Sequence, residues 1–270
     1  MNRRSAATNF ARLKRAGRVW AVASILGEAD RLARLHDRMA PRIADGDRLV
    51  YLGNYFGRGD AVAATIDELL DFRRRILARS RGFACDVVYL RGAQEEMWQK
   101  LLQLQFAPNP GEILAWMVQE GIEATVTAYG GDMRQGFAAS RDGPRTITRW
   151  TSSLRNAMNA APGHTTLFSS LRHAAVTDDL GLLFVHAGVD PSRPLTKQTD
   201  AFWWGSAQDI LELAAPYDGF RRVVRGFDRA RRGLVEAEFA VSLDGGSGRG
   251  GRLIAAAFTP DGVLQDALEA

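Results

Sequence analysis

The sequence has almost no cysteine and no long apolar run. Cys85 is the only cysteine among 270 residues, so the chain forms neither an internal disulfide nor a site built from several thiolates. No uninterrupted apolar segment approaches the ~20 residues that a membrane-spanning helix needs. The apolar stretch at 19–23 follows basic residues but is too short for the core of a signal peptide. We therefore expect a cytoplasmic protein with no transmembrane segment.

The remaining composition is typical of a globular protein. With 46% hydrophobic and 24% charged residues, the chain is neither disordered throughout nor a coiled coil. Residues 1–18 carry six basic side chains and no acidic one. We interpret residues 1–17 as a solvated basic tail. The alternative is a tail that binds nucleic acid or an anionic membrane surface. Because no zinc finger, P-loop or RNA-binding aromatic motif is present, we do not expect a nucleic-acid partner.

Apolar, strand-like segments alternate with amphipathic helical patterns after residue 18. The expected strands are 19–23, 48–52 and 86–90, and the expected helices are 28–39, 60–77 and 94–106. This alternation predicts an α/β fold with a parallel sheet covered by helices. Further helical patterns occupy 112–119, 146–158 and 165–170. We place a helical insertion at about 107–171 within one domain that spans residues 18–270.

The pattern changes to strands without intervening helices in the remainder of the chain. The expected strands are 172–177, 182–186, 222–225, 234–242 and 252–258. They predict mixed or antiparallel β-structure, and thus a second sheet packed on the first. The glycine-rich segment 244–251 is interpreted as a flexible hairpin connection.

Glycine-containing loops follow five of the expected strands. They read ASILGE at 23–28, GNYFGRGD at 53–60, RGAQE at 91–95, FVHAGV at 184–189 and VVRGFD at 223–228. Ligands bind beyond the carboxyl ends of strands in open α/β sheets, and glycine permits tight turns there. The order of these loops resembles the calcineurin-like metallophosphoesterases, in their bacterial phosphoprotein phosphatase branch, whose motifs read GDxHG, GDxxDRG, GNHE, HAG and GH. The resemblance covers about residues 18–260 and implies a four-layer α/β/β/α sandwich with two packed mixed sheets.

The resemblance also implies a site for two divalent metals, such as Mn, Fe or Zn, that generate a hydroxide nucleophile. The positions that match the family's metal ligands hold Ser24, Leu26, Asn54, Ala93, His186 and Phe227. Of these, only His186 keeps the ligand and Asn54 a neutral oxygen, whereas leucine, alanine and phenylalanine have no donor atom. The position of the general acid holds Gln94, whose amide cannot deliver a proton near neutral pH. Gly57 takes the place of the aspartate that orients this acid.

We therefore predict a catalytically inactive phosphatase-like protein, a pseudophosphatase, with no metal cofactor and with a binding or regulatory role toward protein partners. Arg58, Arg91 and Arg225 are candidates for holding phosphate or a phosphopeptide, because the guanidinium group suits phosphate. The alternative is that these arginines pair with acids of the same loops and only hold the loops in place. The acids meant are Asp60, Glu95 and Asp228.

Two other functions stay open. One is a metal-dependent phosphoesterase, a protein phosphatase or a dinucleoside polyphosphatase, whose ligands have moved to nearby acids such as Glu28 or Asp190. The other is binding through the basic tail. We further expect Leu26 and Phe227 to fill the metal cavity, so that chelators leave the melting temperature unchanged. The aromatic side chains of Trp116 and of 202–204 are expected mostly in the core, and the alternative is that they form an interaction surface.

Overall fold

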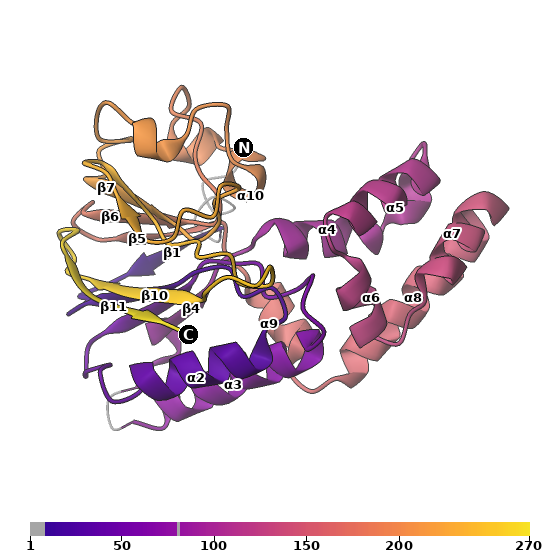
Figure 1. Cartoon of the computed structure of the whole chain (residues 1–270), viewed down its shortest axis with the longest axis horizontal. Coiled ribbons are helices and arrows are strands. Elements are labelled where there is room, and N and C mark those ends of the chain that lie inside the picture. Colours follow the sequence, from indigo (N-terminus) through magenta and orange to yellow (C-terminus); the bar gives the residue numbers. More distant parts are fainter. Residues whose placement is uncertain (1–8, 80–81) are drawn as a thin grey trace.

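Two mixed β-sheets lie face to face at the centre of the molecule (Figure 1). The computed structural model describes residues 9–79 and 82–270. One sheet has five strands: β2 (Val19–Val22), β3 (Arg48–Tyr51), β4 (Val87–Tyr89), β10 (Ile254–Phe258) and β11 (Leu264–Glu269). The other has six: β1 (Phe10–Leu13), β5 (Ala174–Thr177), β6 (Leu182–Val185), β7 (Arg222–Arg225), β8 (Val235–Glu236) and β9 (Ala240–Ser242). The strand orders are β11-β10-β2-β3-β4 and β1-β5-β6-β7-β9-β8. This is the predicted two-sheet architecture.

The parallel strands of both sheets bring their carboxyl ends to one edge of the sandwich. Strands β2, β3 and β4 run parallel to one another, and so do β6, β7 and β9. Their fully buried, β-branched and aromatic residues are typical of strands covered on both faces. The five glycine-containing loops therefore leave their strands at the same edge, which is where a ligand site is expected.

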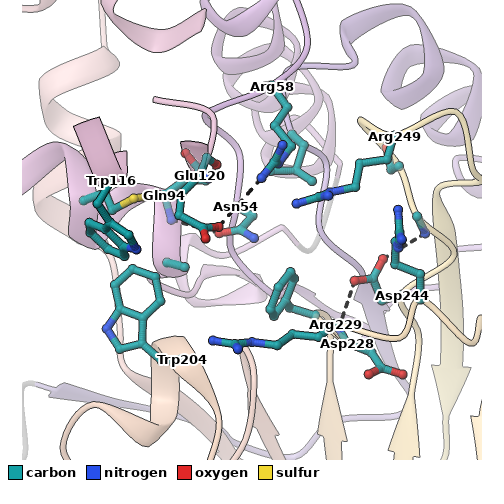
Figure 2. Close-up of a pocket in the computed structure, with 17 residues that line it drawn as sticks. Asn54, Arg58, Gln94, Trp116, Glu120, Trp204, Asp228, Arg229, Asp244 and Arg249 are labelled. Carbon is teal, nitrogen blue, oxygen red and sulfur yellow. Dashed lines mark hydrogen bonds and ion pairs between the residues drawn. The ribbon is translucent and has the colours of Figure 1, made fainter. Parts of the chain in front are cut away.

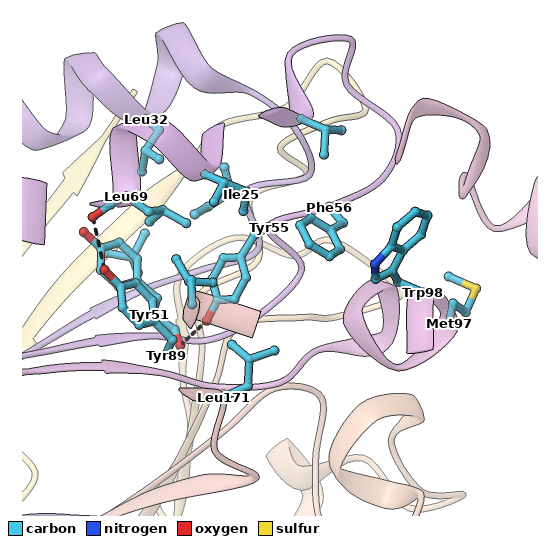
Figure 3. Close-up of a cluster of buried hydrophobic side chains, with 14 of the residues drawn as sticks. Ile25, Leu32, Tyr51, Tyr55, Phe56, Leu69, Tyr89, Met97, Trp98 and Leu171 are labelled. Atoms are coloured by element: carbon cyan, nitrogen blue, oxygen red, sulfur yellow. Dashed lines mark hydrogen bonds between the residues drawn. The ribbon is translucent and has the colours of Figure 1, made fainter. Parts of the chain in front are cut away.

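Helices cover the outer face of the five-stranded sheet. They are α2 (Ala29–Met39) and α3 (Val62–Leu77), which lie below that sheet in Figure 1. Between these helices and the sheet, Tyr51 stacks on Tyr89 with ring centroids 5.2 Å apart (Figure 3). The hydroxyl of Tyr89 donates to the carbonyl of Leu69, and that of Tyr55 donates to the carbonyl of Leu90. Each buried tyrosine thus satisfies its polar atom within the core.

The outer face of the six-stranded sheet has a thinner cover. Short 3₁₀ turns at Leu195–Lys197 and Ile210–Glu212 and the one-turn helix α10 (Ala201–Trp204) lie over it, joined by irregular chain. Phe202 and Trp203 are buried there, as predicted for a core role. The fourth layer is therefore built from loops and single turns rather than from long helices.

A helical arm stands beside the two sheets (Figure 1). It comprises α4 (Ala93–Leu101), α5 (Pro110–Gln119), α6 (Glu123–Ala128), α7 (Met133–Asp142), α8 (Pro144–Ala160) and α9 (His164–Ser170). Proline at the first turn begins α5 and α8, and the Asp132 side chain caps α7 by accepting from the backbone of Arg134. Helices α6 and α7 were not predicted. No helix within the described residues combines the length and the apolar character needed to cross a bilayer.

The structure corrects three predictions about segments. Residues Phe10–Leu13 do not belong to a solvated tail, because they form β1 and pair in parallel with β5. Residues 1–8 lie outside the described residues, so binding through them stays a prediction. The strand expected at 234–242 is a hairpin, with a backbone hydrogen bond from Ala237 to Ala240 between β8 and β9. The glycine-rich segment 244–251 is no hairpin connection, because it passes from β9 in one sheet to β10 in the other.

Candidate functional site

Direct hydrogen bonds tie the strand-end loops together. The backbone of Ser24 donates to the carbonyl of Gly226 at 3.0 Å, and that of Leu26 donates to Asn54 at 2.7 Å. The side chain of Asn54 accepts from the backbone of Gln94 at 3.0 Å. Gly53 makes the close approach possible: its φ is 92°, and a Cβ there would lie 2.6 Å from the backbone nitrogen of Gly92. The sequence motifs therefore converge in space.

Glu95 organises the loop after β3 from inside the protein. Its fully buried carboxylate accepts four backbone N–H groups, from Gly92, Asn54, Tyr55 and Phe56, at 2.8–3.2 Å. Burial raises the pKa of this carboxyl group, and the four donors oppose that rise. Glu95 therefore pairs with backbone and not with an arginine.

His186 lies beneath the surface of the site. Its Nδ1 donates to the carbonyl of Leu52 at 2.7 Å, and its ring stacks under Phe227 at 5.3 Å. Burial lowers the pKa of His186 to about 4, so the ring is neutral at pH 7. Its Nε2 and the buried hydroxyl of Ser24 have no hydrogen-bond partner within the described residues. This histidine is oriented like a metal ligand but is covered by an aromatic ring.

The residues present do not fit a pair of divalent ions. Leu26, Ala93 and Phe227 offer only hydrocarbon at three of the six matched positions. In the described part of the chain, no group of three or more histidine, cysteine, aspartate or glutamate side chains is arranged to hold a metal. The nearby acids have other partners: Glu28 lies 3.6 Å from Arg31, and Asp190 accepts from Ser192.

The backbone at two of these positions is unusual. Leu26 has a φ of 59° and Asn54 a φ of 55°. The left-handed region is tolerated by asparagine but costs leucine roughly 1–2 kcal/mol. Hydrogen bonds from Leu26 and Gly27 to the loop after β3 hold this conformation. The loop geometry is thus imposed by neighbouring backbone and not by the side chain of Leu26.

Gln94 has a structural role in the site. Its Nε2 donates to the carbonyl of Glu120 at 2.8 Å, which ties α4 to the turn after α5. Gly57 gives it room: a Cβ at Gly57 would lie 2.3 Å from Oε1 of Gln94, and the φ of 83° also favours glycine. A side chain at position 57 would therefore require Gln94 to move and the backbone to be strained.

A pocket of about 250 Å³ opens above these residues (Figure 2). Leu26, Asn54, Ala93 and Phe227 form part of its floor, while Ser24 and His186 do not line it. Phe227 covers the buried histidine, and Leu26 and Phe227 leave an open space in the pocket that they line. The charged residues of the lining are Arg58, Arg229, Arg231, Arg249, Glu120, Asp228 and Asp244.

Most arginines of this pocket lack an acidic partner. Arg58 lies 3.7 Å from Glu120, and its pKa is lowered by burial and by the nearby charges of Arg249 and Arg231. Arg229, Arg231 and Arg249 are exposed and form no ion pair with any described residue. Three arginines that gather at one pocket mouth without an ion-pair partner among the described residues favour an anion.

Two of the predicted anion-binding arginines lie elsewhere. Arg91 does not line the pocket; its Nη1 binds Glu96 at 3.0 Å and Gln99 at 2.6 Å. Arg225 is buried and binds Asp209 at 2.9 Å and Asp228 at 3.2 Å. Of the three predicted arginines, only Arg58 lines the pocket.

Asp228 belongs to a network of two arginines and two aspartates. Arg232 binds both Asp228 and Asp209, which Arg225 also binds. Burial raises the pKa of Asp228, but the hydrogen bonds from Arg232 and Ala230 and the charge of Arg225 outweigh it and lower the pKa. The network fixes the loop that carries Arg229 and Arg231. Of the acids predicted to pair with arginine, Asp228 is the one that does so in the described structure.

The glycine-rich segment completes the pocket wall. The hydroxyl of Ser247 donates to the carbonyl of Ile25 at 2.9 Å. The buried carboxylate of Asp244 accepts from the backbones of Asp228 and Gly246 at 2.9 Å, and burial raises its pKa. These bonds place Arg249 at the pocket mouth. Arg249 was not predicted as a site residue, because a low-complexity segment gives no periodic signal. A single arginine among glycines was the signal that could have pointed to it.

Comparison with solved structures identifies the architecture. The chain resembles a candidate diadenosine tetraphosphatase (TM-score 0.60, 21% identity, 97% of this chain and 98% of that one). It also resembles a cold-active protein tyrosine phosphatase (TM-score 0.54, 14% identity, 95% and 80%). A third is a protein serine/threonine phosphatase from Saccharomyces cerevisiae (TM-score 0.50, 13% identity, 97% and 83%). The chain has the calcineurin-like metallophosphoesterase fold.

No family model and no curated protein matches this metallophosphoesterase-fold chain by sequence. The fold nevertheless explains why the loops meet: both sheets of such a sandwich direct parallel strands to the same edge. Within this fold, the pocket at that edge combines a floor poor in metal-binding atoms with a rim of arginines.

Proposed function

We propose that this protein is a catalytically inactive, phosphatase-like binding protein that holds a phosphate-type anion in the strand-end pocket. The observation that supports the proposal is the rim of four arginines, three of them without an ion-pair partner among the described residues, over a floor with leucine, alanine and phenylalanine. The residues that bind the anion in this proposal are Arg58, Arg229, Arg231 and Arg249. A guanidinium group can bind two oxygens of one phosphate, so the arginines replace metals as the source of positive charge.

The proposal needs no chemical step. Gln94 holds its amide against the carbonyl of Glu120 and is no acid or base at neutral pH. A phosphorylated group would be bound and released unchanged. Since the relatives by fold are named as phosphatases, we propose that the chain recognises phosphorylated protein partners or competes for them.

A second candidate is a metal-dependent phosphoesterase, as the names of the similar structures suggest. The observation that favours it is the unpartnered Nε2 of His186, whose other nitrogen donates to a backbone carbonyl as in many metal sites. This activity requires Phe227 to move away from the ring and acids to come from other segments.

Calorimetric titration with inorganic phosphate and O-phosphoserine, together with a phosphatase assay in Mn²⁺, tests the proposal. We expect binding to fall at least tenfold in Arg58→Ala and Arg249→Ala. Arg91→Ala is the matched control, because this arginine lies outside the pocket, and it should bind as the wild type does. Turnover with stoichiometric bound metal would overturn the proposal in favour of the second candidate.

A further inference from the structure

Two tryptophans form one wall of the pocket. Trp116 comes from α5 and Trp204 from α10, and their rings meet edge to face at 5.5 Å and 63°. Trp116 is 39% exposed. Figure 2 shows both indoles on the side of the pocket away from Arg249. Trp204 is partly buried. The indole surface that the two residues present in this concave site is available to a ligand at little cost in conformational entropy.

The floor extends this apolar surface. Phe227, Met97, Ala93 and Leu26 also line the pocket. A bare phosphate would contact the rim and leave the apolar wall and floor in water. A ligand that joins an aromatic ring to the phosphate would cover both, and aromatic contact adds to affinity beyond the buried area.

The charge of the lining suits one phosphate dianion. The lining contains four arginines and three carboxylates. The charge of Asp228 is already neutralised by Arg225 and Arg232, two arginines that do not line the pocket. The carboxylates of Glu120 and Asp244 offset two of the four positive charges. The excess that remains corresponds to the double negative charge of a phosphate monoester.

The pocket continues into two further cavities along the surface. Trp204, Phe227, Asp228 and Arg229 also line a cavity of about 450 Å³ beside the loop that follows β6. Residues 205–208 are shared between that cavity and a third one of about 410 Å³. The charged groups of the second cavity, Arg225, Asp209 and Asp228, are paired with one another. This path has room for extended polypeptide. It adds no unpaired arginine for a second phosphate, because Arg229 already belongs to the first pocket and Arg193 of the third cavity lies 3.2 Å from Asp190.

We infer that the pocket selects phosphate carried on an aromatic ring, as the phosphotyrosine side chain of a polypeptide whose flanking residues follow the adjoining cavities. The inference rests on the proposed function, since it specifies the ligand of the same site. Trp116 and Trp204 are then residues that determine specificity, whereas Arg58 and Arg249 bind any phosphate monoester.

Calorimetric titration of the full chain with O-phosphoserine, phenyl phosphate, a phosphotyrosine peptide and adenosine monophosphate tests the inference. We expect phenyl phosphate to bind about tenfold more tightly than O-phosphoserine, and the peptide more tightly still. Trp204→Ala and Trp116→Ala should bring the ratio of the two affinities, phenyl phosphate over O-phosphoserine, down to about one. Phe106→Ala is the matched control, because Phe106 is 81% exposed and does not line the pocket.

The outcomes separate the two proposals. Equal affinity for O-phosphoserine and phenyl phosphate overturns the aromatic selectivity and leaves anion binding intact. Tighter binding of adenosine monophosphate than of the peptide overturns the choice of polypeptide ligand. Failure of every phosphate compound to bind overturns the proposed function itself.

Discussion

The residues beneath the floor of the strand-end pocket and those at its rim satisfy their polar groups in different ways. Beneath the floor, Glu95 has four backbone donors and His186 donates to a backbone carbonyl and stacks with Phe227. At the rim, Arg229, Arg231 and Arg249 are exposed and form no ion pair with any described residue. Buried polar groups that maintain a fold are paired. The difference indicates that the floor stabilises the protein and that the rim is available to a ligand.

The largest expected effect comes from Arg225→Ala. This variant leaves Asp209 and Asp228 beside a single remaining arginine, and breaking a buried ion pair costs about 3–5 kcal/mol. Urea unfolding measures the change in the free energy of unfolding. Arg249→Ala is the matched control at the rim and should cost less than about 0.5 kcal/mol. Similar losses in the two variants would contradict the distinction between the paired arginine beside the pocket and the unpaired arginines of the rim.

The pH dependence of stability gives a second, slightly smaller effect. The pKa of His186 is about 4 in the folded chain, below its ordinary value of 6.5, so folding favours the neutral ring. This contribution is complete above pH 6.5 and is lost as the pH falls toward 4, by about 3 kcal/mol in all. Urea unfolding between pH 7 and pH 4 measures it. The His186→Gln variant should lose less stability over this pH range. If the free energy of unfolding falls with pH equally in variant and wild type, His186 is not the group responsible.

Glu95→Gln tests the loop that Glu95 organises. An amide presents one oxygen and two unwanted donors to the four N–H groups, so we expect a loss of about 1–3 kcal/mol in the free energy of unfolding. Glu123→Gln, on an exposed position of α6, provides the comparison and should have almost no effect. Urea unfolding measures the loss. An unchanged urea midpoint for Glu95→Gln would show that other contacts hold the loop.

The smallest expected effect is that of a chelator. Because apolar side chains and hydrogen bonds hold the floor, EDTA should leave the melting temperature unchanged in differential scanning fluorimetry. Prior incubation with Mn²⁺ serves as the positive control. A chelator-dependent fall in the melting temperature would reveal a metal that contributes to folding.

Most of the fold could be predicted from the sequence, because hydrophobic periodicity and glycine placement are signals that can be recognised locally. The alternation of strands and helices from β2 to α4 and the five loop motifs were each predicted within a few residues. Strand β11 escaped prediction because its sequence, LQDALE, is only half apolar. Strand β1 was missed because three basic residues surround it, and only its pairing with β5 makes it a strand.

The candidate site was predicted less completely. The six matched positions converge, but the partners of an arginine depend on distant segments. Asp209, which binds Arg225, lies outside every motif. Trp116 and Arg249 reach the pocket from the helical arm and from the glycine-rich segment, so their roles depend on tertiary packing. Spacing along a chain identifies loops that meet and says little about which charges remain unpaired.

The amino-terminal strand has a practical consequence for anyone who shortens this protein. The basic composition of residues 1–17 suggests a start at residue 18. A protein shortened in this way would lack β1, the edge strand of the six-stranded sheet, and the contact of Phe10 with Phe202. Strand β5 would then expose an unprotected backbone edge, which invites pairing between copies. Such a truncated protein would be prone to self-association, and ligand measurements made on it would report the aggregate as much as the pocket.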